Sequence, residues 1–422
     1  MPMSFADFIL QHGNDDPVRL LLARDKYPDI DIDLAATTLE VRKKLKTKVP
    51  EWYAVPSLVY PSRLSGEQCS SSETARYKAS VAFCRSERSE ESVKIADLTG
   101  GMGVDTWAFA QVAGEVLYNE MQEGLARATE LNFRELEVEN VRFSCRKVDV
   151  GKVGEILDGF APDVIFLDPA RRAEDGRKVF LIEECQPDVL GLLPELFAAS
   201  RFLLLKLSPM ADMSMACKRL GEHVKEVHIV AAGGECKELL FLLDREWTGD
   251  YAVFVVENGA VMEIPGQARN DGEGPARNDC ARHGRPDRPS EVPCAGSILF
   301  EPGKALAKAG AFSLPCRFGL TKLGVHTHLY AGEAVPEGLE PFGKWFEVVE
   351  VLPLNNRTMK EAGKRWPQAE VTARNVPMTS DLLRKKTGCA SGGDIHLFGV
   401  RVDAVAEAGN YLIITKKRYG TD

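Results

Sequence analysis

Glycine and acidic residues recur between positions 97 and 168 at spacings that suit a nucleotide-binding site. The richest segment reads Ala96-Asp97-Leu98-Thr99-Gly100-Gly101-Met102-Gly103-Val104-Asp105. Glycines let the backbone approach a ligand closely, and the free N–H groups at the start of a following helix favour a carboxylate or a phosphate. We therefore predict that this turn cradles an adenosine or a charged tail.

Thr106 separates this turn from the dinucleotide-binding fingerprint. After Gly101 and Gly103, that fingerprint requires a third glycine at position 106. The threonine argues against a nicotinamide or flavin cofactor. Asp97 also points elsewhere, because a carboxylate inside the strand that feeds the turn is costly unless it binds the loop backbone or a ligand.

Acidic residues also follow the next apolar segments. Glu120 comes after Val116-Leu117-Tyr118, and Asp149 closes a strand predicted over 141–148. A strand predicted over 163–167 delivers Asp168 to the same edge of the sheet. In an open parallel sheet ligands bind at this edge, where an acid can chelate ribose hydroxyls. Asp149 is a candidate acceptor for an adenine amine or for an adjacent backbone group.

Each acid also has a purely structural explanation. Asp97 could tie its own loop, Asp149 could cap a turn, and Glu120 could cap a helix that starts at Met121. Any one of these explanations is plausible alone. The combination favours a ligand site.

The elements that must position these residues alternate between strand and helix from Val93 to Arg245. The predicted elements include strands at 93–98 and 202–207, helices at 104–112 and 210–221, and a terminal strand pair at 224–230 and 238–243. This alternation predicts an α/β fold with a Rossmann-like, doubly wound sheet. Residues before about position 78 have mostly helical spacing.

The set resembles the class I S-adenosylmethionine-dependent methyltransferases, over roughly residues 74–245 for a domain of normal size. The glycine turn is similar to their first motif, Glu120 to their ribose-binding acid and Asp149 to their adenine-side acid. Asp168-Pro169-Ala170-Arg171 is similar to their catalytic fourth motif. The resemblance implies S-adenosylmethionine as cofactor, with these binding residues: Asp97, Thr99, Gly100, Gly101, Gly103, Asp105, Glu120, Asp149 and Asp168.

A closer resemblance is to a bacterial RNA methyltransferase family with ferredoxin-like and THUMP-like segments after the catalytic domain. It is carried by Glu67-Gln68-Cys69, Thr74-Ala75-Arg76-Tyr77-Lys78, residues 167–172, and the stretch from Pro353-Leu354-Asn355-Asn356-Arg357 to Gly392-Gly393-Asp394. We expect an N-terminal helical region (1–78), a methyltransferase domain (79–247), a ferredoxin-like domain (248–340) and a THUMP-like RNA-binding domain (341–422).

The catalytic candidates are Asp168, Pro169, Arg171 and Lys206. Asp168 is the best candidate for orienting the acceptor or taking its proton. Lys206, at the carboxyl end of a central strand, could neutralise a phosphate or polarise a base carbonyl, and a structural ion pair with Asp168 is the alternative.

The fourth motif lacks the aromatic ring of relatives that stack a flipped base before methylating its exocyclic amine. Ala170 and Arg171 occupy those positions, so this chemistry is in doubt unless a Phe or Trp arrives from elsewhere. Arg171 and Arg172 could bind a phosphate or stack on a base instead. Covalent uracil C5 chemistry is also disfavoured, because Lys206-Leu207-Ser208-Pro209 lacks a cysteine and Cys217 falls in the next helix.

Basic residues gather in the last predicted module, whose pattern over 346–415 is strand, helix, strand, helix, strand, strand. Thr379 or Ser380 can cap a helix that carries Arg384, Lys385 and Lys386. The preceding helix carries Arg357, Lys360, Lys364 and Arg365. The family resemblance implies RNA binding, for which the candidates are Arg357, Lys364, Arg384, Lys385 and Lys386, whereas by themselves these residues could form a solvated surface.

Composition is that of a water-soluble, folded protein of two to four domains: 422 residues, 44% hydrophobic and 27% charged. The net charge of −9 argues against nucleic-acid contacts over the whole surface, while residues 341–422 hold 13 Lys and Arg against 9 Asp and Glu. Ten cysteines without a CxxC pair, and no membrane-length apolar run or signal peptide, favour the cytoplasm and argue against zinc.

Two other features have weaker functional interpretations. His326-Thr327-His328 is predicted on one strand with both histidines on one face, a possible metal pair that lacks a third ligand, so no metal is expected. Segments 84–92 and 266–293 are predicted disordered inserts. The second repeats Ala-Arg-Asn-Asp, and a translated repeat without a role explains it better than RNA contact.

These observations lead to one main hypothesis and two alternatives. The main hypothesis is an S-adenosylmethionine-dependent methyltransferase that modifies a base in structured RNA, tRNA or rRNA. The alternatives are a small-molecule methyltransferase, and an RNA-binding or assembly factor with a vestigial cofactor pocket.

Overall fold

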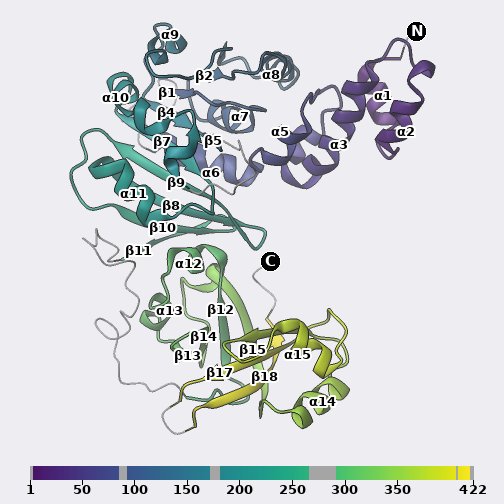
Figure 1. Cartoon of the computed structure of the whole chain (residues 1–422), viewed down its shortest axis with the longest axis vertical. Helices are drawn as coiled ribbons and strands as arrows, with labels where there is room; N and C mark the ends of the chain where they lie inside the picture. The colour runs from purple at the N-terminus through teal and green to yellow at the C-terminus, as the bar shows by residue number, and fades with distance from the viewer. Residues whose placement is uncertain (1–2, 85–92, 172–180, 266–290, 405–406, 419–422) are drawn as a thin grey trace. The chain divides into compact units, whose positions relative to one another are not determined.

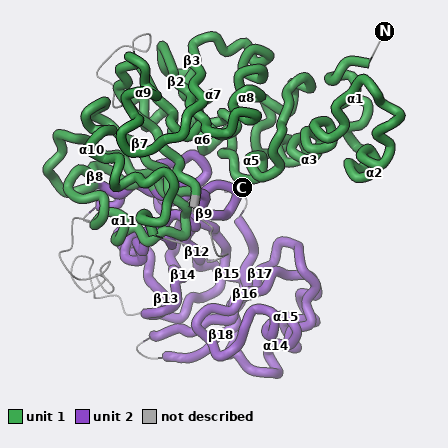
Figure 2. The backbone as a smooth tube through the Cα atoms, turned by 45° about the horizontal axis from the view of Figure 1, so that its top comes forward, with its two compact units in different colours: residues 1–228, 238–251 green, residues 229–237, 252–422 purple. Residues whose placement is uncertain are grey.

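The computed structural model describes residues 3–84, 93–171, 181–265, 291–404 and 407–418. They divide into two compact units, residues 1–228 with 238–251 and residues 229–237 with 252–422 (Figure 2). The inserts predicted at 84–92 and 266–293 lie outside the described residues except for Cys84 and 291–293, and Arg172 also lies outside them.

Unit 1 begins with a helical region, as predicted from the apolar spacing. Its helices are α1 (Phe5–Gln11), α2 (Pro17–Leu22), α3 (Ile32–Lys48), α4 (Pro50–Tyr53), α5 (Arg63–Gln68) and α6 (Ser72–Phe83) (Figure 1). The side chain of Ser71 accepts a hydrogen bond from the N–H of Thr74 and fixes the start of α6. Helix α6 packs on α7 (Val104–Ala110), the helix that follows the glycine turn.

A twisted sheet follows, most of it in unit 1, and confirms the α/β, Rossmann-like prediction. Its strands are β1 (Lys94–Asp97), β2 (Glu115–Asn119), β3 (Val141–Ser144), β4 (Val164–Leu167), β7 (Phe202–Leu207), β8 (Val224–Ala232) and β9 (Glu235–Asp244). They lie in the order β8-β9-β7-β4-β1-β2-β3. Neighbours from β7 to β3 are parallel, whereas β9 runs antiparallel to β7.

The parallel strands bring their carboxyl ends to one edge because helices connect them. These helices are α7, α8 (Glu123–Glu135), α9 (Val153–Leu157) and α10 (Val189–Ala199), with α11 (Met213–Leu220) between β7 and β8 (Figure 1). A short antiparallel pair, β5 (Ala170–Arg171) with β6 (Cys185–Gln186), follows β4. The strand predicted over 141–148 is wrong in its length: β3 ends at Ser144, and residues 145–149 belong to no strand or helix.

Unit 2 contains the hairpin of β10 (Ala252–Glu257) and β11 (Ala260–Ile264) and a second sheet. The strands of that sheet lie in the order β13-β14-β12-β15-β18-β17-β16. Their bounds are β12 (Ile298–Pro302), β13 (Thr321–Gly324), β14 (Thr327–Gly332), β15 (Gly343–Pro353), β16 (Glu370–Arg374), β17 (Ile395–Val402) and β18 (Gly409–Lys417). Because β12 pairs with β15, the two predicted C-terminal domains contribute to one sheet. The boundary near position 340 stays a prediction.

Both faces of the second sheet are apolar. Alternation along β17 and β18 sends Phe398 and Ile413 into one cluster and Leu397 and Leu412 into the other. The second cluster includes side chains of α14 (Asn356–Arg365) and α15 (Ser380–Thr387). The other helices of unit 2 are α12 (Lys304–Ala309) and α13 (Leu314–Arg317).

The structure corrects the predicted histidine pair. His326 lies in the turn between β13 and β14, so it does not share a strand face with His328, which stacks on Phe312 at 3.8 Å between ring centroids. Residues 3–84, 93–171, 181–265, 291–404 and 407–418 contain no group of three His, Cys, Asp or Glu side chains placed to hold a metal. Within the same ranges, no helix is both long and apolar enough to cross a membrane.

Candidate active site

The glycine turn between β1 and α7 has no room for larger residues at two of its three glycines. A Cβ atom at Gly100 would lie 2.2 Å from the ring of Tyr118, and one at Gly103 would lie 2.6 Å from the Thr129 side chain. Gly103 also has φ of +87°, a left-handed conformation that glycine adopts without strain. Its N–H donates to the carbonyl of Gly100 at 2.8 Å, which closes the turn.

Asp97 ties this turn to β1, as the structural explanation of that residue predicts. One carboxylate oxygen accepts from the Thr106 hydroxyl at 2.6 Å and the other from the Thr99 N–H at 3.1 Å. Burial raises the pKa of Asp97 to about 8, and the nearby carboxylates of Asp105 and Asp168 contribute to the rise. Thr106, at the position of the missing third glycine, therefore stabilises the turn from within α7.

Glu120 bridges the glycine turn and the start of α8. One of its oxygens accepts from the Gly101 N–H at 3.1 Å and the other from the Gln122 N–H at 2.8 Å. The predicted helix start at Met121 is two residues early, because α8 begins at Glu123. Each carboxylate oxygen has two lone pairs, so each can still accept a hydrogen bond from a ribose hydroxyl.

Within the described residues, the Asp149 side chain makes no hydrogen bond or ion pair with Asp97, Glu120 or Asp168. It lies beyond the end of β3, its side chain is 50% exposed, and it pairs with Lys147 at 2.7 Å. The prediction of a strand end at this residue is wrong, since β3 stops five residues earlier. Its assignment as an adenine-side acid stays a prediction.

Asp168 follows β4 and is tied to the glycine turn by Thr99. The Asp168 N–H donates to the Thr99 hydroxyl at 2.6 Å. One carboxylate oxygen of Asp168 accepts from the Nζ of Lys206, on the neighbouring strand β7, at 2.5 Å. The ion pair that the sequence left as an alternative is therefore present, while the Asp168 side chain stays 36% exposed.

Lys206 is enclosed by carboxylates. Burial lowers the pKa of this ammonium, but Asp168, Glu238 and Asp105 together raise it above its ordinary value. Lys206 is therefore a cationic hydrogen-bond donor at neutral pH and does not serve as a base. Pro169 comes directly before β5. In β5 the backbone of Arg171 pairs with that of Cys185, while the Arg171 side chain lies outside the described part of the structure.

Three residues of this site were missed by sequence reasoning about catalysis: Ser70, Lys78 and Glu238. Lys78 is fully buried on α6 and donates to both carboxylate oxygens of Glu238 at 2.8 Å. Asp105, predicted to bind cofactor, accepts instead from Ser70 at 2.8 Å and lies 3.2 Å from the Lys78 ammonium. The sequence does contain a signal for this pair. Lys78 stands among the buried alanines of α6, and Glu238 directly precedes the apolar residues of β9.

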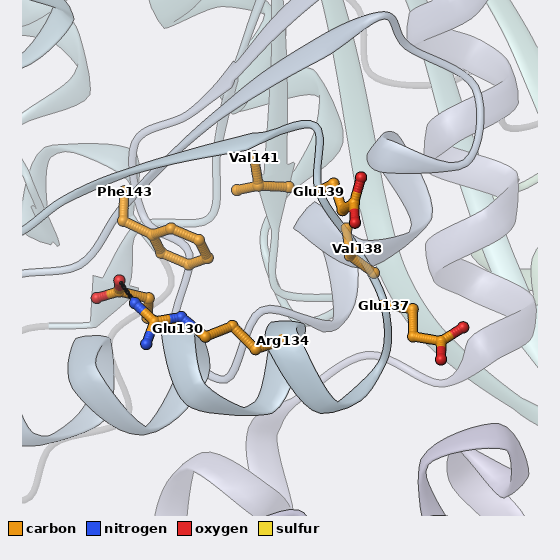
Figure 3. A pocket seen from close by; sticks show the side chains of 7 residues that line it. All are labelled: Glu130, Arg134, Glu137, Val138, Glu139, Val141 and Phe143. Carbon is orange, nitrogen blue, oxygen red and sulfur yellow. Dashed lines mark hydrogen bonds and ion pairs between the residues drawn. The ribbon is translucent and has the colours of Figure 1, made fainter.

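A hollow elsewhere on unit 1 is separate from these residues. Side chains of α8, of β3 and of the segment between them line it, as Figure 3 shows. Four of its seven lining residues are charged, and Glu130 pairs with Arg134 across one turn of α8. The hollow contains none of the predicted site residues, so it does not support a catalytic role.

The predicted RNA-binding residues divide into exposed groups and structural ones. Arg357 is 84% exposed and pairs with Glu361, and Lys364 and Lys385 are exposed on α14 and α15. Arg384 instead donates to the Ala369 carbonyl and pairs with Glu370, both at 3.1 Å. Lys386 donates to Asn356 at 3.3 Å, which links the two basic helices.

Comparisons with known proteins cover both units. A family model described as THUMP domain-like matches residues 343–417, and one described as a ferredoxin-like domain matches residues 299–338. The crystal structure of a putative methyltransferase from Porphyromonas gingivalis W83 is 30% identical, covering 98% of this chain and 97% of that chain, with a TM-score of 0.77. No curated protein matches the chain.

Smaller structures match about two fifths of the chain. An rRNA methylase from Streptococcus thermophilus is 13% identical, covering 40% of this chain and 94% of that chain, with a TM-score of 0.29. A protein from Streptococcus mutans in complex with SAH is also 13% identical, covering 41% of this chain and 96% of that chain, with a TM-score of 0.28.

Proposed function

The chain belongs to the class I methyltransferase family that carries ferredoxin-like and THUMP-like domains at the C-terminus, and from this premise we propose that it transfers a methyl group from S-adenosylmethionine to a base of structured RNA. The observation that carries the proposal is the 2.6 Å hydrogen bond between Thr99 and Asp168. It joins the turn that would cradle the cofactor to the acid that would hold the acceptor.

The residues of the turn fit this cofactor. The backbone of Gly100 and Gly101 can approach a ligand closely, and Glu120 keeps acceptor capacity for two ribose hydroxyls. When bound, S-adenosylmethionine supplies an electrophilic methyl group next to a positive sulfonium. The carboxylate of Glu120 would provide negative charge on this side of the sheet.

Asp168 would align the acceptor and take its proton. Methyl transfer is an in-line displacement, so the protein mainly has to hold the acceptor at a near-attack distance with its lone pair available. Lys206 fixes one oxygen of Asp168, and the side chain is partly exposed, so its other oxygen can face an acceptor. The cation at Lys206 can in addition donate to a base carbonyl.

The exposed lysines of α14 and α15 support RNA as the substrate. Lys364 and Lys385 are exposed and form no ion pair with the part of the chain that the structure describes, so both are available to phosphates. Arg384 is used by the fold itself and is a weaker candidate. The THUMP-like match over 343–417 covers both helices.

Mass spectrometry of RNA nucleosides from cells with and without the protein tests the proposal most directly. We expect one methylated nucleoside to be missing, which would identify the base and the atom together. Asp168→Ala should retain S-adenosylmethionine binding in calorimetry and fail to restore that nucleoside. An unchanged level of methylation in the Asp168→Ala strain would refute the role of this residue.

A small-molecule substrate is the competing outcome. Deleting residues 341–422 is a poor test, because it removes β15 from the middle of the second sheet. Charge reversal at Lys364 and Lys385 leaves the sheet intact. A methyltransferase that keeps its full rate after this change, on a defined metabolite, would replace the RNA proposal.

A further inference from the structure

A chain of alternating buried charges runs from α6 to Asp168. The Lys78 ammonium, with no exposed surface, donates to both oxygens of Glu238 on β9 at 2.8 Å. Glu238 lies 4.0 Å from the ammonium of Lys206, and Lys206 donates to Asp168 at 2.5 Å. The chain thus connects a helix outside the sheet to the candidate catalytic acid through two strands.

Lys78 has no donor left for another partner. An ammonium group carries three N–H bonds. Besides Glu238, Lys78 donates to the Ser70 hydroxyl at 3.0 Å and lies 3.2 Å from Asp105. Ser70 in turn donates to Asp105 at 2.8 Å, so the far end of the chain is held from α5–α6 and from α7. The position of Glu238 is therefore defined by several elements at once.

A buried ion pair of this kind is weak evidence for stability. The cost of removing two charges from water often exceeds the gain, and well-packed apolar residues commonly replace such pairs without loss. The geometry here gives the pair a second effect, since the same carboxylate also lies near Lys206. Without Glu238, the largely buried Lys206 ammonium would lose one of the negative charges that stabilise it.

We propose that Lys78 and Glu238 are positioning residues for methyl transfer, which hold Lys206 against Asp168 so that one oxygen of Asp168 stays directed to the acceptor. This inference rests on the proposed function of the same site. Neither residue touches the reacting atoms. They act through Lys206 alone.

Three variants separate positioning from simple structural support. Glu238→Gln removes one charge, and Lys78→Met with Glu238→Gln removes both and leaves no unpaired charge at Lys78. We expect the double variant to fold and to bind S-adenosylhomocysteine with an affinity within about threefold of that of wild type. Its transfer of tritiated methyl groups to RNA should be about 100-fold slower, which is the loss expected when a catalytic group is misplaced by about 1 Å. Asp244→Asn is the matched control, because Asp244 is also buried on β9 but pairs with Arg201 and Lys225 at the other end of the strand.

The division of the loss between kcat and KM provides a readout that lost stability does not move. Lys206 is surrounded by Asp168 after β4, Glu238 on β9 and Asp105 on α7, with the cation of Lys78 on α6 beyond them. Because Glu238 and Lys78 act on the position of Asp168 and not on RNA binding, the loss should fall on kcat in Glu238→Gln and in the double variant, with the KM for RNA near the wild-type value. Asp244→Asn should keep both constants.

A crystal structure of the double variant decides the inference even if RNA is not the substrate. Positioning predicts that Lys206 and Asp168 move beyond hydrogen-bond distance. A retained contact near 2.5 Å, or a double variant with wild-type kcat, would overturn it. If wild-type protein transfers no methyl group to RNA, the proposed function fails while the Lys206–Asp168 distance still tests the positioning role.

Discussion

Gly100→Ala is the sharpest test of the glycine turn, because the structure leaves no space for the added methyl group. The new Cβ would lie 2.2 Å and 2.3 Å from two ring carbons of Tyr118. This ring is fully buried, and its hydroxyl donates to the Gly101 carbonyl at 2.7 Å, so it cannot move without breaking the turn. Inserting a methyl group into such a packed site costs about 1–3 kcal/mol.

The severe overlap at Gly100 places the expected cost at the upper end, about 3 kcal/mol. Hydrogen exchange over β1 and β2 should then be faster by about 100-fold, because 1.4 kcal/mol corresponds to a factor of ten. Calorimetry should show S-adenosylmethionine binding weakened as well, since the turn must shift away from its cradle geometry.

Gly124→Ala is the control for this substitution. Gly124 lies in α8, and its added Cβ meets no atom within 4 Å. Alanine favours a helix over glycine by about 0.5–1 kcal/mol, so this variant should be slightly more stable than wild type and bind the cofactor normally. Wild-type exchange rates and cofactor affinity in Gly100→Ala would refute the described packing of the turn.

Three further changes test separate parts of the protein. Glu120→Gln replaces one of two accepting oxygens by a donor, so the partly buried hydrogen bond from the N–H of Gly101 or of Gln122 to a charged acceptor is lost at a cost of about 1–3 kcal/mol. We expect calorimetry to show about 10- to 100-fold weaker S-adenosylmethionine binding. Asp97→Asn tests the raised pKa of Asp97, which is about 8 in the folded protein and 3.8 in the unfolded chain. Between these pH values the folded protein keeps the proton and the unfolded chain releases it, so the free energy of unfolding of wild type should fall relative to that of the variant as pH rises. Urea unfolding that gives the same pH dependence for both proteins would contradict this. Lys364→Glu with Lys385→Glu should weaken RNA binding and flatten its dependence on salt, whereas an unchanged salt slope would argue against phosphate contacts by α14 and α15.

Local sequence patterns predicted most elements close to their observed bounds. The helices predicted at 104–112 and 210–221 contain α7 and α11, and the C-terminal order of strand, helix, strand, helix, strand, strand is that of β15, α14, β16, α15, β17 and β18. The bounds of these elements depend on the spacing of apolar residues and on helix caps such as Thr379, and both act over a few residues. The error over 141–148 has the same origin, because the alternation of apolar and polar residues continues past Ser144 to Cys145 and Arg146, while the neighbouring strand β2 ends at Asn119 and offers no further partner.

The sequence by itself determined the glycine turn and the acids Asp97, Glu120 and Asp168 at the ends of β1, β2 and β4, because each depends on residue type at a short, fixed spacing. Tertiary structure decided how these residues are used. It showed that Asp105 faces Lys78 and Ser70, and that Asp168 is held by Lys206. Glu238 is 160 residues from Lys78, and only the packing of α6 against the sheet brings them within 2.8 Å. Such a pair leaves no short-range pattern in the sequence. The cost of removing each charge from water and the attraction that offsets it arise only when both charges are buried together.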